Sequence, residues 1–314
     1  MAKHPTVLCP VDFSDASKGA LRYAHAITKH FRARLVILAV EDPLLTEAMD
    51  LGTGVVWNPE DTRRELSHFV SKMLHGNPLK DADVEYHIAV GKPAPQILHT
   101  AQEEACDLIV MSTHGLTGMR RLFFGSTTER VLRETTVPVL ATPPTDEGPA
   151  DIEDIRRVVG RVLVPVDLTD ASLPQIQVAR GLAEALHVPL IATHVVEPVR
   201  SPLAGKLHLP SIELERRTRA EDALGELLAT LPRQLHPEAL VAYGDPAEEI
   251  AKVARDRNAG LIVVGLHGSP MLGPRMGSVT YRVLCLAPVL VLALPPARAR
   301  NGTRAPAVRA EVMQ

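Results

Sequence analysis

Short apolar runs alternate with helical periodicity along the first half of the chain. Five runs of aliphatic residues predict strands near residues 6–11, 34–40, 83–90, 107–112 and 137–142. Between the first two runs, apolar residues recur three and four positions apart and predict a helix that buries Ala16, Ala20, Ala24, Ile27 and Phe31. Further helices are expected near residues 59–75, 93–105 and 126–134.

The second half of the chain repeats the first. Five ordered segments recur: Pro10-Val11-Asp12-Phe13-Ser14 as Pro165-Val166-Asp167-Leu168-Thr169, Gly91-Lys92-Pro93-Ala94 as Gly244-Asp245-Pro246-Ala247, Leu108-Ile109-Val110 as Leu261-Ile262-Val263, Gly125-Ser126 as Gly277-Ser278, and Pro138-Val139-Leu140 as Pro288-Val289-Leu290. Such a series predicts two copies of one fold in tandem.

Alternating strands and helices are typical of a parallel sheet covered by crossover helices. We therefore predict an α/β protein of two Rossmann-like, doubly wound domains, each with a five-stranded parallel sheet flanked by helices. The expected boundaries are a first domain at 1–143, a linker at 144–158, a second domain at 159–295 and a disordered tail at 296–314. In this fold, ligands bind at the carboxyl ends of the strands where the strand order reverses. Asp12, the turn from Ser112 and the turn at Gly125 are expected on that rim.

Charge and aromatic content argue against a nucleic-acid binder. The 314 residues include 34 Lys and Arg against 37 Asp and Glu, for a net charge of −3, so no positive field would attract nucleic acid or an anionic membrane. Five Phe, four Tyr and one Trp offer few platforms for stacking bases.

Cysteine usage and hydropathy favour the cytoplasm. Cys9, Cys106 and Cys285 are an odd number without a C-x-x-C pair, so neither a disulfide framework nor a thiolate zinc site is expected. No apolar run approaches the ~18 residues of a membrane span, and the amino terminus lacks the apolar core of a signal peptide. We expect a cytoplasmic protein without a membrane partner.

The turn after the fourth strand carries the clearest candidate chemistry. The first copy has Ser112-Thr113-His114-Gly115, nine residues, then Gly125-Ser126-Thr127-Thr128; the second has Gly265-Leu266-His267-Gly268, eight residues, then Gly277-Ser278-Val279-Thr280. Glycine allows a close backbone approach, and a turn that opens a helix directs N–H groups outward. This combination binds phosphate.

With the Asp after the first strand and the G-x-P-A segment, these turns resemble the universal stress protein family over nearly all of residues 5–294. The family motif is G-x-x-G, nine residues, then G-[S/T]. The resemblance implies a stress-response regulator that binds ATP, with or without Mg²⁺, in one or both copies. Adenosine would contact the first two strands, and the glycines and hydroxyls would hold phosphates. The implied binding residues are Pro10, Val11, Asp12, Val40, Gly115, Gly125, Ser126 and Thr127, with Pro165, Val166, Asp167, Val196, Gly265, Gly268, Gly277, Ser278 and Val279.

Both copies depart from the family motif. Ser112 replaces the first glycine in one copy, and the other has one residue fewer in a loop that contains Pro270 and Pro274. An interaction scaffold with decayed pockets is therefore the alternative function. A weak ATPase is a third possibility, but the Walker motif is absent and no catalytic base or nucleophile is identified, so at most slow hydrolysis is expected.

Two further features have structural interpretations beside the functional ones. Ser126 and Glu129 form an S-x-x-E capping box, which is compatible with phosphate binding. His114 and His267 occupy matching positions, and a structural role in the turn is favoured over a general-acid role. No metal-ligand spacing is found.

The last strands, near 137–142 and 287–294, should lie at sheet edges. Because family members commonly dimerise through this strand, we predict that the two copies pair with each other. A homodimer of the whole chain is a further expectation.

Overall fold

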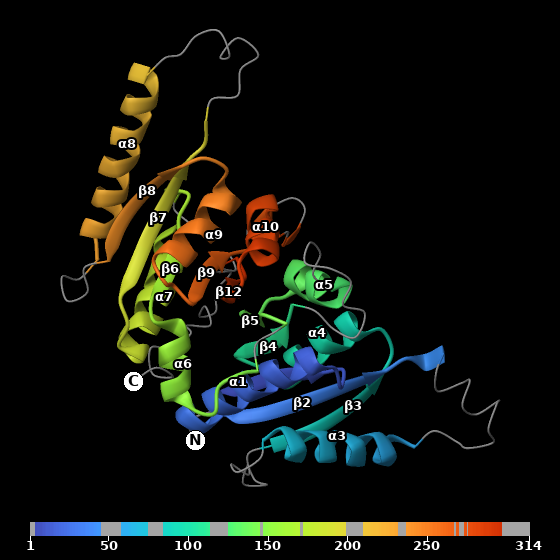
Figure 1. Cartoon of the computed structure of the whole chain (residues 1–314). Coiled ribbons are helices and arrows are strands. Elements are labelled where there is room, and N and C mark those ends of the chain that lie inside the picture. Colours follow the sequence, from blue (N-terminus) through green and yellow to red (C-terminus); the bar gives the residue numbers. More distant parts are fainter. Residues whose placement is uncertain are drawn as a thin grey trace. The chain divides into compact units, whose positions relative to one another are not determined.

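The computed structural model describes residues 4–44, 58–74, 84–113, 125–144, 147–169, 172–198, 210–231, 237–266, 268–269, 273–274 and 276–296. The chain forms two compact units. The five strands of the first copy lie in one unit and the five long strands of the second copy lie in the other (Figure 1).

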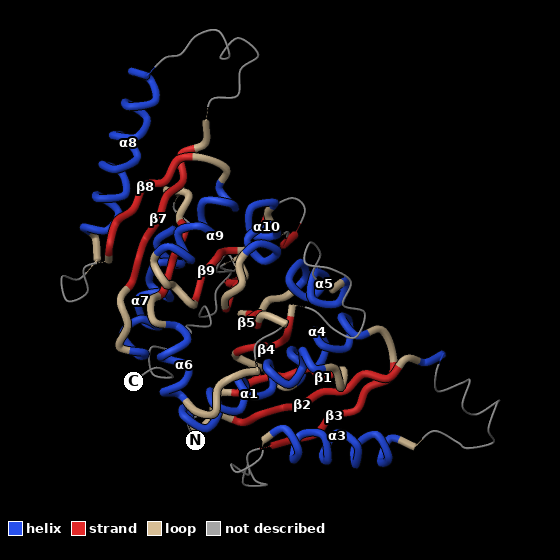
Figure 2. Tube along the Cα trace, in the orientation of Figure 1, coloured by secondary structure: helices blue, strands red, loops and turns tan. Residues whose placement is uncertain are grey.

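The first unit has a parallel sheet in the order β3-β2-β1-β4-β5. Its elements are β1 (Thr6–Val11), α1 (Asp15–Phe31), β2 (Arg34–Glu41), α3 (Pro59–Met73), β3 (Val84–Val90), α4 (Pro93–Glu103), β4 (Leu108–Ser112), α5 (Ser126–Glu134) and β5 (Val139–Thr142). The alternation of strands and helices along the trace is evident in Figure 2.

Helix α1 shows why this sequence covers the sheet. Ser14 caps the helix by accepting a hydrogen bond from the Ser17 N–H at 3.2 Å. Ala16, Ala20 and Ala24 are buried, as the periodicity predicts, whereas Ile27 and Phe31 are only half-buried. The small alanine side chains let the helix lie close to the central strands β1 and β4.

The second unit repeats this arrangement in the order β8-β7-β6-β9-β12, again parallel throughout. Its elements are β6 (Val162–Pro165), α7 (Ser172–Leu186), β7 (Leu190–Val196), α8 (Pro210–Ala229), β8 (Glu238–Tyr243), α9 (Pro246–Asp256), β9 (Leu261–Gly265), α10 (Ser278–Leu286) and β12 (Leu290–Leu294). The predicted fold class, two tandem Rossmann-like domains with five-stranded parallel sheets, is confirmed.

A short antiparallel pair lies between β9 and α10 along the chain. It joins β10 (Gly268–Ser269) to β11 (Gly273–Pro274), with Gly268 opposite Pro274. Pro274 therefore belongs to a small hairpin in the loop that precedes the helix.

One of the five repeat matches is wrong by two residues. Val139 lies opposite Ile109 in the first unit, and Val291 lies opposite the equivalent Ile262 in the second. Val291 is thus the counterpart of Val139, and Val289 lies before β12 begins. A shift of two keeps every strand residue on the same face, so the alternation of apolar residues could not reveal the error.

The segment between the copies, which the sequence predicts as a linker at 144–158, contains helix α6 (Ile152–Val159). Ile155 and Val159 are its buried residues. Upstream, the Arg22 guanidinium of α1 donates to the Glu147 carbonyl at 3.1 Å. The predicted domain boundaries stay a prediction, and residues 297–314 of the predicted tail lie outside the described residues.

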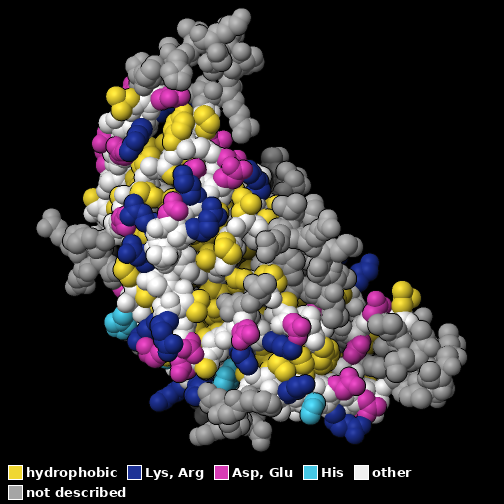
Figure 3. All heavy atoms as spheres, in the orientation of Figure 1, with side chains coloured by type: hydrophobic (Ala, Val, Ile, Leu, Met, Phe, Trp, Pro, Cys, Tyr) yellow, Lys and Arg dark blue, Asp and Glu magenta, His cyan; other side chains and the backbone are white. Residues whose placement is uncertain are grey.

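Charge and hydropathy on the folded chain follow the composition. Acidic and basic side chains are interspersed among apolar ones over the face drawn in Figure 3. Within the described ranges, no helix has both the length and the apolar character that a membrane crossing requires.

Candidate functional site

The candidate site of each unit lies at the carboxyl ends of two adjacent strands. The strand order reverses between β1 and β4 in the first unit and between β6 and β9 in the second. Asp12 follows β1 and Ser112 ends β4, so both lie at the reversal, as expected from sequence. Asp167 and Gly265 hold the equivalent places in the second unit. This is where open α/β sheets bind ligands.

The Asp after the first strand organises the turn into the first helix. Asp12 Oδ1 accepts hydrogen bonds from the Ser14 N–H at 3.1 Å, the Ser14 hydroxyl at 2.6 Å and the Ser17 hydroxyl. Asp12 is half-buried, so its carboxylate lies at the rim and not in the core. The preceding Pro10 is also half-buried, and Val11 is buried in the sheet.

The second unit builds the same turn. Asp167 Oδ1 accepts from the Thr169 N–H at 3.1 Å, the Thr169 hydroxyl at 2.7 Å and the Ser172 hydroxyl at 2.9 Å. Asp167 is exposed, while Pro165 is half-buried and Val166 is buried.

The residue after each Asp has a positive φ, which is 60° at Phe13 and 61° at Leu168. Bulky residues rarely adopt this left-handed conformation, whose cost is about 1–3 kcal/mol. The hydrogen bonds of the Asp carboxylate offset that cost. In the first unit the ring of Phe13 also packs edge-on against Phe69 of α3, with centroids 5.5 Å apart.

Glycine opens the helix after the fourth strand in both units. Gly125 is the N-cap of α5 and Gly277 is the N-cap of α10, and in neither helix does a side chain of the described residues cap the first turn. The Gly125 N–H donates to the Thr113 carbonyl at 2.8 Å, which holds the turn against the end of β4. The first-turn N–H groups are therefore oriented as in helix-terminal phosphate sites.

The capping box predicted for Ser126 and Glu129 is wrong. Ser126 is the first residue inside α5 and is exposed, because Gly125 already has the extended conformation of an N-cap. Glu129 instead accepts from the Arg133 guanidinium one turn later at 2.6 Å. The Ser126 hydroxyl is thereby left on the surface of the first turn.

A threonine ties each of these helices to the strand before it, a link that sequence reasoning missed. The Thr128 hydroxyl donates to the Ser112 carbonyl at 2.9 Å, and the Thr280 hydroxyl donates to the Gly265 carbonyl at 3.1 Å. Both threonines are buried and stand three residues after the turn glycine. This shared spacing is the sequence feature from which the link could have been predicted.

Some of the other residues predicted to contact phosphate are described by the structure and some are not. Thr127 is half-buried on α5, Ser278 and Val279 are exposed on α10, and Gly268 lies in β10. Gly115 lies outside the described residues, as do His114 and His267.

The two valines predicted at the end of the second strand are not equivalent. The Gly91 N–H donates to the Glu41 carbonyl at 2.9 Å, whereas the equivalent Gly244 N–H donates to the Val196 carbonyl at 3.1 Å. Val196 is therefore the counterpart of Glu41, and Val40 corresponds to Val195. Since successive strand residues point to opposite faces, Val40 and Val196 face opposite sides of their sheets.

A cavity of about 400 Å³ lies at the carboxyl end of β7 in the second unit. This volume is within the lower range of small-molecule sites. Arg216 of α8 donates to the Glu197 carbonyl at 2.8 Å at its edge, and His194 Nδ1 lies 2.9 Å from the Val166 carbonyl oxygen. The lining residues are His194, Val195, Val196, Glu197, Arg216, Arg219 and Ala220.

Both copies match known proteins in sequence. The family model for the universal stress protein family matches the chain twice, over residues 4–143 and 159–295. The chain belongs to the universal stress protein family. Universal stress protein YxiE of Bacillus subtilis is 33% identical over 142 residues, which cover 43% of this chain and 95% of that protein.

A solved structure that spans both copies shows the same fold. A universal stress protein from Archaeoglobus fulgidus covers 92% of this chain and 98% of its own, with 18% identity and a TM-score of 0.60. A universal stress protein solved in complex with cAMP covers 46% of this chain and 100% of its own, with 24% identity and a TM-score of 0.34.

Proposed function

We propose that this protein is a cytoplasmic stress-response regulator that binds ATP in one or both units. The observation that carries the proposal is the glycine-opened first turn of α5 and α10, which no described side chain caps and which stands beside the reversal of strand order. Helix N-termini of this kind favour anions through their N–H groups and the helix dipole.

The proposed contacts divide by chemistry. Pro10, Val11, Asp12 and Val40 would hold adenosine in the first unit. Pro165, Val166 and Asp167 would hold it in the second, where Val196 would contribute from the adjoining cavity and not from the place of Val40. Phosphates would contact the turns that begin at Gly115, Gly125, Gly265, Gly268 and Gly277, with the Ser126, Thr127 and Ser278 hydroxyls. The backbone N–H groups of these turns and the hydroxyls are hydrogen-bond donors, which suit an anion. Mg²⁺ would bind together with the triphosphate.

The second unit is the stronger candidate of the two. It keeps Gly265 where the first unit has the buried Ser112, so less side chain restricts a backbone approach. The cavity beside Val196 is bordered by Arg216 and Arg219, which add positive charge. Val279 in place of Thr127 removes one hydroxyl from its helix, which favours the first unit in that one respect.

Bound nucleotide would act by favouring one conformation or assembly, which requires unequal affinity for two states. We also propose that β5 and β12 mediate pairing of the two copies and that the chain forms homodimers. Slow exchange of the amide hydrogens of both strands would support that pairing, and fast exchange of alternate amides would contradict it.

Calorimetry with Mg-ATP tests nucleotide binding by the intact chain, Gly125→Asp and Gly277→Asp. A carboxylate placed at the anion site repels phosphate, so we expect at least about tenfold weaker binding from the variant that alters the occupied unit. Gly225→Asp is the matched control, because a Cβ at Gly225 of α8 meets nothing within 4 Å. ADP and cAMP as further probes separate adenosine recognition from triphosphate recognition.

Two outcomes would overturn the proposal. Absence of binding by the intact chain at millimolar ATP would favour the interaction scaffold and direct the search to protein partners. Equal loss with Gly225→Asp would attribute the effect to added charge and not to the turns.

A further inference from the structure

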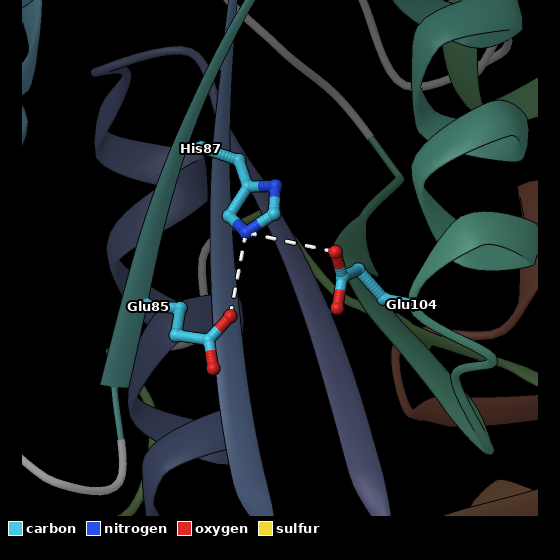
Figure 4. A group of neighbouring side chains, drawn as sticks. All are labelled: Glu85, His87 and Glu104. Atoms are coloured by element: carbon cyan, nitrogen blue, oxygen red, sulfur yellow. Dashed lines mark ion pairs between the residues drawn. The ribbon is translucent and has the colours of Figure 1, made fainter.

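A cluster of three potential metal ligands lies on the first unit, away from the rim. Glu85 and His87 stand two residues apart on β3 and so share one face of the sheet, and Glu104 follows the end of α4. His87 Nε2 lies 3.5 Å from Glu85 Oε2 and 3.9 Å from Glu104 Oε1 (Figure 4). Two of the side chains come from β3 and the third from the end of α4, and all three point toward one another.

The spacing of these donor atoms suits a cation better than direct hydrogen bonds. Distances of 3.5 and 3.9 Å exceed those of charge-assisted hydrogen bonds, which are about 2.7–2.9 Å. Zinc bonds to imidazole nitrogen and carboxylate oxygen are about 2.0–2.2 Å, which sets the donors of a tetrahedral site about 3.3–3.6 Å apart. All three donor atoms lie within 4.8 Å of one another.

Arg34 hydrogen-bonds to both carboxylates, including Glu85 Oε2, the oxygen that lies 3.5 Å from His87 Nε2. Its Nη1 lies 2.9 Å from Glu85 Oε2 and 3.0 Å from Glu85 Oε1, and its Nη2 lies 2.7 Å from Glu104 Oε2. Glu104 Oε1 is the oxygen that faces His87.

Two carboxylates and one guanidinium carry a net charge of −1, which attracts a divalent cation. An outer partner that holds carboxylate ligands in place is common around metal sites, and its loss typically costs ten- to a hundredfold in affinity.

The second unit provides an internal contrast at the same positions. Glu238 is the counterpart of Glu85, since they lie opposite the equivalent residues Ile191 and Val36. Leu240 replaces His87, and Arg257 replaces Glu104 at the end of the helix. Glu238 forms an ion pair with Arg257 instead. A protein cation thus takes the place of the imidazole and the second carboxylate.

We propose that Glu85, His87 and Glu104 bind a first-row divalent cation of the zinc type at the amino edge of the first sheet. One imidazole and two carboxylates are typical zinc donors, and solvent would complete the coordination. The side chains are 47%, 32% and 24% exposed, so a cation can enter from solvent. Five residues of β3 lie between Glu85 and the carboxyl end of the strand. At ~3.3 Å per residue this is about 16 Å, so the cation site is separate from the proposed nucleotide site.

Calorimetric titration of the full chain with Zn²⁺ and with Mg²⁺ tests the site. We expect saturable Zn²⁺ binding in the wild type and at least tenfold weaker binding in His87→Leu, which installs the residue of the second unit. Mg²⁺ should bind much more weakly, because it prefers an octahedral shell of oxygen atoms. Zn²⁺ should raise the Tm of the wild type and not that of His87→Leu.

Glu104→Gln is a second variant, chosen because it keeps the size of the side chain if His87→Leu fails to fold. It should also lose at least tenfold in Zn²⁺ affinity, whereas His99→Leu, an exposed histidine of α4, should bind Zn²⁺ as the wild type does. Equal affinity and Tm shift in all four proteins would overturn the proposal, as would the absence of saturable Zn²⁺ binding below millimolar concentration.

Discussion

The two units use the same contacts at the carboxyl edge of the sheet and different ones at the amino edge. At the carboxyl edge, Asp12 and Asp167 support matching turns, and Thr128 and Thr280 form matching ties to the preceding strand. At the amino edge, Glu85 lies beside His87 and pairs with Arg34, whereas Glu238 pairs with Arg257 and Arg161. The contacts are thus the same where they support the turns with positive φ at Phe13 and Leu168. The side chains around Glu85 and Glu238 support no such turn, and they differ between the units.

A second contrast concerns the start of the helix after the third strand. Asp245 caps α9 through its Oδ1, which accepts from the Ala247 and Glu248 N–H groups, and its Oδ2 accepts from Arg282 of α10 at 2.6 Å. The hydrogen bond from Arg282 lowers the pKa of Asp245. Lys92 holds this position in the first unit and makes no side-chain cap. The helix start is therefore anchored by a charged cap in the second unit, and in the first unit the Gln96 amide donates to the Val90 carbonyl at 3.2 Å.

The largest expected effect comes from the glycines of the two G-x-P-A segments. Gly91 and Gly244 have φ values of 145° and 150°, a region that is essentially closed to other residues. We expect Gly91→Ala and Gly244→Ala each to lower the free energy of unfolding by about 1–3 kcal/mol in denaturant titrations. Gly244→Ala should lose more, because its Cβ would lie 2.9 Å from Glu249 Cγ, whereas at Gly91 the contact is the flexible end of Gln96.

Gly225→Ala is the control for both glycine variants. Gly225 lies inside α8 with open space around it, so alanine should stabilise the helix by up to about 1 kcal/mol. A loss of stability at Gly225 equal to that at Gly244 would contradict the argument from backbone conformation.

A smaller effect is expected from the threonine ties. Thr128→Val and Thr280→Val keep the side-chain shape but remove the hydroxyl that donates to the strand carbonyl, so each should cost about 1 kcal/mol of unfolding free energy. Thr127→Val, which gives α5 the residue that α10 has at Val279, should change stability by less than about 0.5 kcal/mol. An equal loss of unfolding free energy in all three variants would show that the hydrogen bonds of Thr128 and Thr280 do not add to stability.

The smallest effect is a pH dependence confined to the first unit. His25 is buried on α1, and burial together with the charge of Lys29 lowers its pKa. The unfolded chain binds a proton below about pH 6.5 and the folded chain resists it, so stability decreases as the pH falls from about 6.5. Denaturant midpoints at about pH 7.5 and 5.5 should therefore differ less in His25→Gln than in the wild type. Identical pH dependence in the two proteins would exclude His25 as the source.

Most of the fold followed from local patterns in the sequence. The predicted strand at 6–11 and helix at 126–134 have the bounds observed for β1 and α5, because apolar periodicity and a turn glycine act over a few neighbouring residues. Errors arose where the sequence could be read in two registers. Val289 was matched to Val139 through a repeated Pro-Val-Leu, although the strand pairs Val291 in that place.

The sequence by itself therefore determined the tandem repeat, the parallel α/β class and the glycine-opened helices, since each depends on residues close together along the chain. Only the tertiary structure decided that Gly125 and not Ser126 begins α5, that Val196 corresponds to Glu41, and that the Thr128 hydroxyl reaches β4. It also brought Glu85, His87 and Glu104 to one place. These relations depend on which strands pair and in which register, and pairing is set by packing between segments that are distant in sequence.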